Sequence, residues 1–223
     1  MSKELINQNY YLISVAIIVL AFVVFFFSYE KKKPQAREIV TLAVMSAIAI
    51  ASRAAFAAIP FFKPMLGIIM ITGMAFGSGA GFLTGAVSGF VSNFIFGQGP
   101  WTPWQMFAYG VGGALAGFLA KKGIMNEKKK LRTAVIGYVI IQAIVGPLLD
   151  VCSIFTMGNT VAKEYVLSIF ASGFIPNAIH GLATFLTLLL LCKPMMEKLN
   201  RMKLKYGMMS EEADEISQLS SDD

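Results

Sequence analysis

The sequence predicts an all-α polytopic membrane protein with seven helical spans. Of its 223 residues, 56% are hydrophobic and only 14% are charged, and the mean hydropathy is +0.66. Several apolar runs reach the roughly 20 residues that a helix needs to cross a hydrocarbon core of about 30 Å. Lipid offers the backbone no hydrogen bonds, so helices are the expected form of such runs. The period-2 alternation of a membrane barrel is not evident.

The first expected span, Tyr10–Ser28, is followed directly by the charged run Glu30–Lys33. A secretory signal carries its positive charge before the apolar run and a small-residue cleavage site after it. The order here is the reverse, so we expect an uncleaved helix with its N-terminus outside. Residues 1–35 would then form an extra transmembrane helix and a basic linker.

The second expected span, Ile39–Ile59, contains small residues at every fourth position: Ala43, Ala47, Ala51 and Ala55. A spacing of four places them on one helical face, where the backbone of another helix can approach closely. Ordinary packing within the chain explains the same pattern. Arg53, in the outer part of this span, needs a partner, a ligand or a wet cavity.

The stretch Met65–Phe96 has 32 residues without a charge. As a single helix it would measure about 48 Å, which is too long for a bilayer. Two short spans joined at the turn Gly77–Gly81 would place the Lys121–Arg132 loop on the same side as Lys31–Lys33. We therefore expect two spans.

Three further spans are expected at Trp104–Ala120, Thr133–Leu149 and Tyr165–Leu191, the last with a bent or interfacial start. Residues 194–223 form a basic and then acidic tail that we expect to be partly disordered. With these spans, fifteen of the 19 Lys and Arg residues fall on one side and three on the other. The positive-inside rule places the C-terminus in the cytoplasm and the tryptophan-containing turn outside.

The turn within Ser92–Met106 gathers both tryptophans together with amide side chains, prolines and glycines. Proline and glycine favour a defined non-helical turn, and tryptophan favours the membrane–water boundary. Two more outer connections, Phe61–Lys63 and Asp150–Glu164, are expected to converge on it. The candidate ligand-binding residues are Arg53, Asn93, Gln98, Trp101, Trp104, Gln105, Asp150, Asn177 and His180.

Each of these residues also has a structural explanation. Arg53 and Asp150 could simply neutralise each other, and a lone histidine such as His180 is often a satisfied core residue. The tryptophans and glutamines could form an interfacial belt. Intramembrane polar groups are nevertheless a functional hypothesis by default, because leaving them unpaired in hydrocarbon costs several kcal/mol.

Several chemistries have no motif in the chain. It contains no P-loop, no His-Glu-x-x-His and no paired-cysteine site, so we expect no ATP binding by this subunit, no metal and no cofactor. The basic residues sit in short loops, which indicates topology rather than a nucleic-acid surface. A channel is expected to have rings of similar residues or a polar stripe along its pore, and neither is evident. An intramembrane hydrolase using Ser88 and His180 remains an alternative.

Three segments of the chain resemble the substrate-binding S components of energy-coupling factor (ECF) vitamin transporters, in particular their cobalamin-type group. The alanine ladder is similar to the Ala-x-x-x-Ala motif by which S components dock on a transmembrane coupling subunit. Residues Asn93–Gln105 are similar to the third-to-fourth helix region of the cobalamin-type group. Pro176–His180 lies early in the final helix, where the family contributes ligand contacts.

The resemblance covers roughly Ala36–Leu191 and implies a six-helix S-component core at residues 36–193, with the N-terminal helix as an addition. It implies a multi-pass protein of the bacterial cell membrane that captures a vitamin outside and topples to release it inside. A coupling protein and two ATP-binding subunits encoded elsewhere would power transport. Cobalamin is the leading substrate by this resemblance, with Arg53 or Lys63 available for its phosphate; riboflavin or another vitamin is the alternative.

Overall fold

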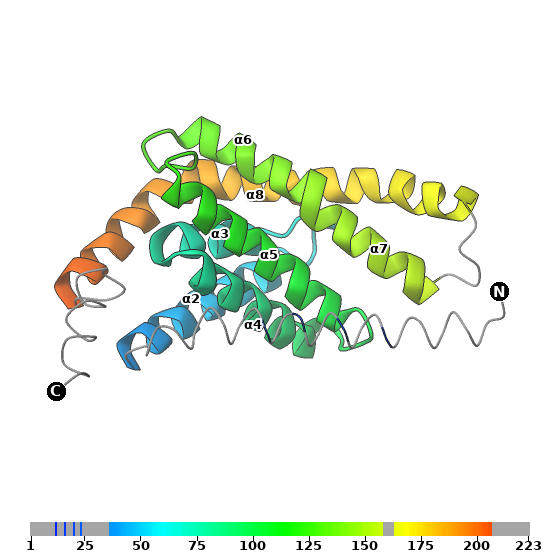
Figure 1. Ribbon diagram of the computed structural model, residues 1–223, viewed down its shortest axis with the longest axis horizontal. Helices are drawn as coiled ribbons and strands as arrows, with labels where there is room; N and C mark the ends of the chain where they lie inside the picture. Colours follow the sequence, from blue (N-terminus) through cyan, green and yellow to red (C-terminus); the bar gives the residue numbers. More distant parts are fainter. Residues whose placement is uncertain are drawn as a thin grey trace.

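The computed structural model describes residues 36–157 and 163–206 and the single positions 12, 16, 20 and 23. These residues form helices and no strand, and the helices pack into one bundle (Figure 1). The predicted all-α class is therefore confirmed. Apart from those four positions, the expected helix Tyr10–Ser28 lies outside the described residues, as do residues 207–223. The helices are α2 (Ala36–Ala55), α3 (Met65–Phe76), α4 (Ser78–Phe96), α5 (Thr102–Lys121), α6 (Lys130–Ile140), the π-helical η1 (Ile141–Val145), α7 (Gly146–Met157) and α8 (Lys163–Tyr206).

Four helical stretches in the described residues are long and apolar enough to cross a membrane: Ala36–Ala55, Ser78–Phe96, Lys130–Ile154 and Lys163–Tyr206. The apolar α3 has 12 residues and is shorter than a span. All of its residues are buried, as expected for a helix that is hydrophobic on every side. The chain is thus a multi-pass membrane protein, but these helices do not establish the expected count of six core spans plus one.

The expected break in Met65–Phe96 lies at Gly77, between α3 and α4. Gly77 has φ +92°, a conformation that favours glycine, and its N–H donates to the Gly73 carbonyl at 2.8 Å. Both helices then pack closely on α5. A Cβ atom at Gly113 would lie 2.3 Å from the Gly81 carbonyl oxygen, so backbone meets backbone at this point.

The last two helical stretches are longer than we expected. The stretch predicted as Thr133–Leu149 begins at Lys130 and runs without interruption to Met157, with η1 directly before Pro147. Proline removes a helical donor and clashes with the preceding turn, which accounts for the local widening. The expected connection Asp150–Glu164 is therefore wrong for its first part, which is helical. Similarly, α8 continues past Leu191 to Tyr206, so residues 194–206 are helical.

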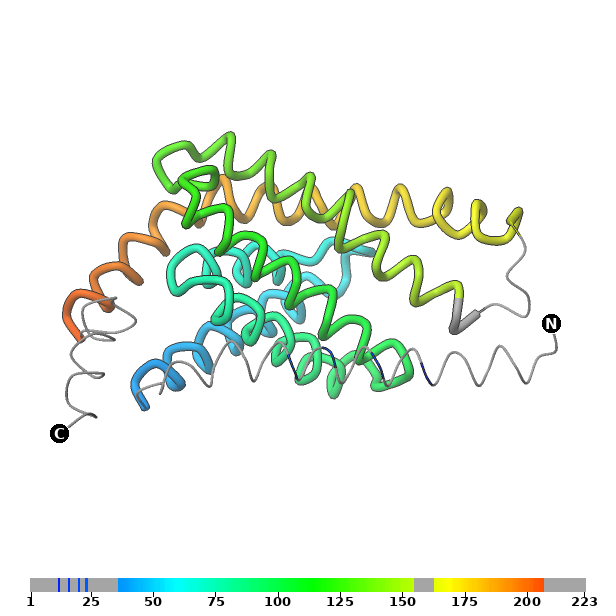
Figure 2. Tube along the Cα trace, viewed as in Figure 1, coloured from blue at the N-terminus to red at the C-terminus, as the bar shows by residue number. Residues whose placement is uncertain are grey.

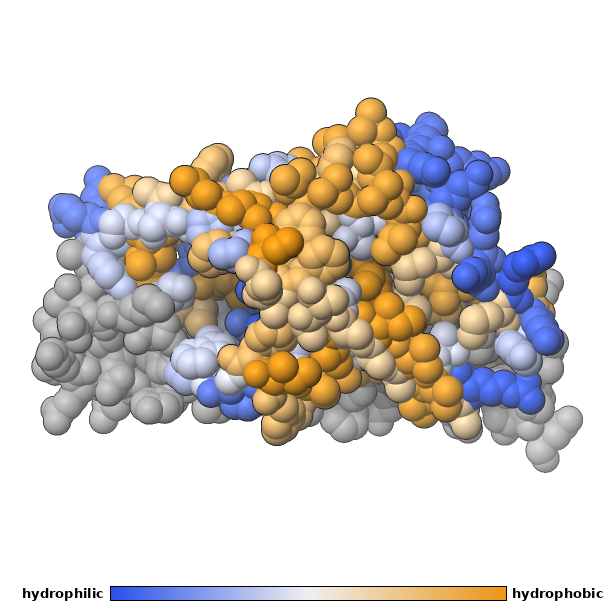
Figure 3. All heavy atoms as spheres, turned by 180° about the vertical axis from the view of Figure 1, so that it is seen from behind, coloured by the Kyte–Doolittle hydropathy of each residue, from blue (hydrophilic) through white to orange (hydrophobic). Residues whose placement is uncertain are grey.

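The two ends of the bundle differ in charge. One end holds the start of α2, the α5–α6 connection and the end of α8, as Figures 1 and 2 show. On the face seen in Figure 3, apolar side chains cover the middle, and hydrophilic ones gather most densely at this same end. We call it the basic end. The opposite end holds the α4–α5 turn, the end of α7 and the start of α8. The described lysine-rich segments thus share one end, as the charge pattern predicted.

Candidate functional site

Polar side chains toward the end of the bundle opposite the basic end, which the charge pattern predicts to be outside and which we call the outer end, fall into three groups. The first is a hydrogen-bonded network that joins α2, α4 and α5. The second is a carboxylate–amide pair between α7 and α8. The third is a set of deeply buried polar atoms, on α4, α5, η1 and α8, that have no hydrogen-bond partner. Most of the predicted site residues belong to the first two groups.

The first group, here called the Arg53 network, starts from α2. The Arg53 guanidinium Nη1 donates to Ser92 Oγ at 2.5 Å and to Asn93 Oδ1 at 3.0 Å, both on α4. The guanidinium also lies over the Phe96 ring, 4.4 Å from its centroid. Arg53 and Asn93 are 7% and 1% exposed. A buried cation is thus held by neutral acceptors and an aromatic face, in the way that burial of a charge requires.

Asn93 carries the same network onward to the α4–α5 turn. Its amide Nδ2 donates to Thr102 Oγ1 at 3.0 Å and to Gln105 Oε1 at 2.9 Å. Thr102 Oγ1 donates to Gln98 Oε1 at 2.8 Å, and Gln98 Nε2 donates to the Phe90 carbonyl at 3.0 Å. These bonds fold the turn between Gly97 and Trp101 back onto the two helices that it joins. The network therefore fixes the turn to the outer ends of three helices.

The second group joins α7 to α8. Asn177 Nδ2 donates to Asp150 Oδ2 at 2.9 Å, and both residues are buried. Gly173 allows this approach, because a Cβ atom there would lie 2.3 Å from the Asp150 carboxylate. Arg53 and Asp150 thus have separate partners, and no ion pair joins them in the described part of the chain. The explanation of Arg53 and Asp150 as one structural pair is not supported.

The third group consists of buried side-chain atoms without a hydrogen-bond partner. On α8, His180 Nε2 and Thr184 Oγ1 are in this state, and their residues are 5% and 0% exposed. Others are Thr84 Oγ1 and Ser88 Oγ on α4, Tyr109 Oη on α5, Gln142 Oε1 in η1 and Tyr165 Oη near the start of α8. Leaving a polar group unpaired inside a protein costs about 1–3 kcal/mol, so such a concentration requires an explanation.

Tyr109, on α5, contacts both α8 and α4, the two helices that carry most of the unpaired atoms. Its ring lies edge-on to the His180 ring, with the centroids 6.3 Å apart and the planes at 87°. On its other side it meets α4 at Gly89, where a Cβ atom would lie 3.3 Å from Tyr109 Cδ2. The interior near His180 therefore combines unpaired hydroxyl and imidazole groups with an aromatic face.

Ser88 and His180, the residues of the alternative hydrolase interpretation, are not hydrogen-bonded to each other. Ser88 Oγ and His180 Nε2 both lack a hydrogen-bond partner, so the nucleophile–base hydrogen bond of a serine hydrolase is not made. No group of three His, Cys, Asp or Glu residues that could hold a metal ion occurs in the described ranges. The polar atoms can instead donate to and accept from a bound molecule.

Several expectations about single residues change in the structure. Trp101, at the start of α5, is 41% exposed, whereas Trp104 is 4% exposed and belongs to the interior. Sequence reasoning did not select Ser92, Thr102, Tyr109, Gln142 or Thr184. Two periodicities could have found some of them: Thr84, Ser88 and Ser92 recur every fourth residue, and Asn177, His180 and Thr184 share one face of α8.

The alanine ladder lies on the outer surface of α2. Ala43, Ala47, Ala51 and Ala55 are all exposed, and the neighbouring Val40 and Val44 are 61% and 51% exposed. The opposite side of α2 packs into the bundle through Leu42, Met45 and Ala49. The ladder is therefore not used for packing within the described part of the chain. The alternative that it serves only this internal packing is not supported.

Comparison with known proteins gives one informative result. A family model described as "ECF-type riboflavin transporter, S component" matches residues 33–197. Searches of curated proteins and of solved structures give no significant match. The matched range contains the Arg53 network, the Asp150–Asn177 pair and every unpaired buried atom described above. Because the match covers most of the chain, this protein belongs to the family of ECF transporter S components, the vitamin-capturing membrane subunits that work with an ECF energy-coupling module.

Proposed function

We propose that this chain binds one vitamin between its outer network and its buried polar atoms, and passes it inward after docking on the coupling module. The observation that carries the proposal is the family match across residues 33–197. The module would consist of a transmembrane coupling protein and two ATP-binding subunits. The chain itself would be a non-enzymatic component of the bacterial cell membrane, with its N-terminus outside and the basic end in the cytoplasm.

The unpaired buried atoms support a ligand position near His180. A ligand with hydrogen-bond donors and acceptors would pair with Tyr109 Oη, His180 Nε2 and Thr184 Oγ1 and offset their desolvation. The aromatic ring of Tyr109 offers a face for a flat ligand. The predicted contacts Arg53, Asn93, Gln98 and Gln105 already satisfy one another, so we assign them to the frame of the site. The unpaired atoms are thus assigned to ligand binding, and the hydrogen-bonded residues are assigned to holding the helices together.

Riboflavin is the first vitamin to test, because the matching family is described as a riboflavin transporter component. Its flat ring system carries carbonyl and N–H groups along one edge and a hydroxylated chain. These groups suit the hydroxyl, imidazole and amide groups of the unpaired set. Pockets for such ligands are mainly apolar with a few convergent polar groups, as is the interior here.

Cobalamin is the second candidate, because residues Asn93–Gln105 resemble the cobalamin-type group. Cobalamin carries a phosphate that the cationic Arg53 or Lys63 could bind. Its amide rim would suit Gln98 and Gln105, and its flat macrocycle would suit Trp101 and Trp104. These contacts require the α4–α5 turn to open, because the Arg53 network closes on itself.

The decisive experiment compares ligand binding with stability in variants that remove only unpaired atoms. Tyr109→Phe and Thr184→Val keep the side-chain shape and break no hydrogen bond in the free protein. We therefore expect the melting temperature without ligand to stay equal or rise, while the Kd for the vitamin rises about tenfold, the effect of one lost hydrogen bond. Leu190→Ala, at a position 67% exposed on the same helix, is the control.

Binding is measured by isothermal calorimetry on the purified chain without ATP, first with riboflavin and then with cobalamin. If Tyr109→Phe and Thr184→Val both bind the vitamin with the wild-type Kd, the two hydroxyl groups do not contact the ligand. Failure of the wild-type chain to bind either vitamin would contradict both ligand assignments. Uptake in cells is expected only when the coupling module is co-expressed.

A further inference from the structure

The helix α8 is much longer than a membrane span needs to be. The helix has 44 residues and is therefore about 66 Å long, roughly twice the hydrocarbon core. Pro194 lies inside it and removes one intrahelical donor. In Figures 1 and 2, the orange C-terminal part bends away from the line of the yellow part and runs along the basic end. We call residues 194–206 the C-terminal arm.

One side of this arm is attached to the bundle. Met196 and Leu199 are each 6% exposed and belong to the hydrophobic core. Lys203 Nζ donates to the carbonyl oxygen of Ala75, near the end of α3, at 2.9 Å. At the arm's last residue, the Tyr206 ring lies 5.6 Å from the Arg37 guanidinium of α2. These contacts fix which side of the arm faces outward.

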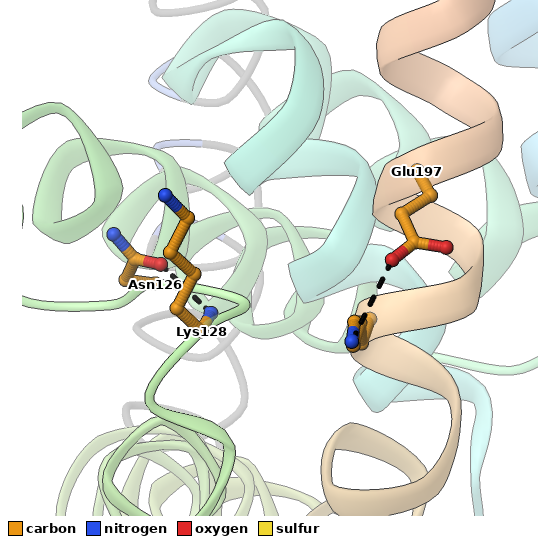
Figure 4. A network of polar contacts seen from close by, with 4 residues as sticks. Asn126, Lys128 and Glu197 are labelled. Atoms are coloured by element: carbon orange, nitrogen blue, oxygen red, sulfur yellow. Dashed lines mark hydrogen bonds and ion pairs between the residues drawn. The ribbon is translucent and has the colours of Figure 1, made fainter.

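The outward side carries a stripe of positive charge. Lys198, Arg201 and Lys205 recur at spacings of three and four, so they share the face opposite Met196 and Leu199, and all three are exposed. The arm's single acidic residue, Glu197, is paired with Lys193 at 3.9 Å (Figure 4). No ion pair neutralises the stripe in the described ranges.

Exposed apolar side chains border the stripe on both sides. Leu204 is 86% exposed and Met202 is 37% exposed. A helix that alternates basic and apolar side chains on its exposed surface is typical of the membrane interface, where apolar groups reach the acyl chains and cations meet headgroups. The apolar run of α8 ends at Cys192 and charged residues begin at Lys193, just before the arm, so we place these side chains at headgroup depth.

We propose that the stripe Lys198–Arg201–Lys205 is a binding surface for anionic phospholipid headgroups. The bilayer holds such lipids at this depth, and each Lys or Arg near an anionic surface adds about a fivefold preference for it. The bound lipid would hold the arm across α2 and α3 at the basic end. The inference is independent of which vitamin the protein carries.

The test places a fluorophore on the arm and asks which lipid surrounds it. Leu204→Cys is labelled with bimane, since Cys152 and Cys192 are buried, and the full chain is placed in nanodiscs. Brominated phosphatidylglycerol or brominated phosphatidylcholine is added at equal fractions, and quenching of the label is compared. We expect stronger quenching by the phosphatidylglycerol, and a smaller difference at high salt.

The variant K198Q/R201Q/K205Q should abolish this difference. The matched control K128Q/K129Q/K130Q removes three exposed lysines from the α5–α6 region at the same end and should retain it. A size-exclusion profile equal to the wild type establishes that each variant is folded. Equal quenching by the two lipids in the wild type would overturn the proposal. Loss of the quenching difference in both variants would also overturn the proposal. Retention of the difference in the stripe variant would overturn it too, and would point to a protein partner for the stripe instead.

Discussion

Replacing Asn93 with leucine tests whether the Arg53 network holds the outer ends of α2, α4 and α5 together. Leucine has a similar volume but removes all three side-chain hydrogen bonds: those with Arg53 at 3.0 Å, Thr102 at 3.0 Å and Gln105 at 2.9 Å. The side chain is 1% exposed, so water cannot replace the lost partners. The substitution leaves a buried guanidinium with one fewer acceptor and Gln105 with one fewer donor.

The magnitude follows from these three bonds. Hydrogen bonds between membrane helices average about 0.6 kcal/mol, which gives about 2 kcal/mol for three. Counting the charged donor at about 2 kcal/mol and the neutral pairs at about 1 kcal/mol each gives about 4 kcal/mol. We expect Asn93→Leu to destabilise the protein by about 2–4 kcal/mol. For a chain of this size that corresponds to a fall of about 4–16 °C in Tm.

The assay is thermal unfolding in detergent, at one scan rate for all variants because membrane proteins often unfold irreversibly. Asn93→Asp keeps an oxygen for Arg53 but loses both donated bonds, so its Tm should lie between those of Asn93→Leu and the wild type. Gln98→Ala, at the exposed edge of the network, should lower Tm by less than about 3 °C. If Asn93→Leu unfolds at the same temperature as Gln98→Ala, Asn93 is not the centre of this network.

Three further substitutions test other parts of the fold and its use. Ala47→Leu, on the exposed side of α2, should leave stability and vitamin binding unchanged and abolish uptake with the coupling module; reduced binding would argue against a separate docking face. Gly113→Ala should cost about 1–3 kcal/mol because its Cβ would meet the Gly81 carbonyl, and Gly112→Ala should cost less in the same denaturation assay because its Cβ would meet only side-chain ends. Asn177→Leu leaves the Asp150 carboxylate without its donor and should cost about 1.5–3 kcal/mol in thermal unfolding; adding Asp150→Leu should restore part of that loss, and no restoration would show that the pair is uncoupled.

The helical class and the shared basic end could be predicted because they depend on composition and on the placement of charge. The break at Gly77 followed from the same reasoning, since only two helices return the Lys121–Arg132 loop to the side of the earlier lysines. The partners of Arg53 could not be predicted. Ser92 and Asn93 are 39 and 40 residues away in sequence, and they meet Arg53 only through the packing of α2 on α4.

The length of α8 shows a second limit of sequence reasoning. Basic residues after Leu191 indicated the end of a span. They do not end the helix itself, because Met196 and Leu199 continue its apolar face and bury against the bundle. Pro194 bends the helix rather than stopping it, since one lost hydrogen bond is outweighed when the flanking turns are packed.

Under the proposed function, the two networks bear on where a ligand would enter. The hydrogen bonds of Arg53 and Asn93 join α2, α4 and α5, whereas the bond of Asn177 to Asp150 joins α7 and α8. Neither network, as described, contains a residue of the other. An opening between α4–α5 and α7–α8 would keep both networks intact, whereas separating α4 from α5 would break the bonds of Asn93. His180 on α8 meets Tyr109 on α5 at this boundary, so a small movement there would expose the unpaired atoms first. A flat ligand can use such an opening, whereas a bulky macrocycle would also have to displace the α4–α5 turn.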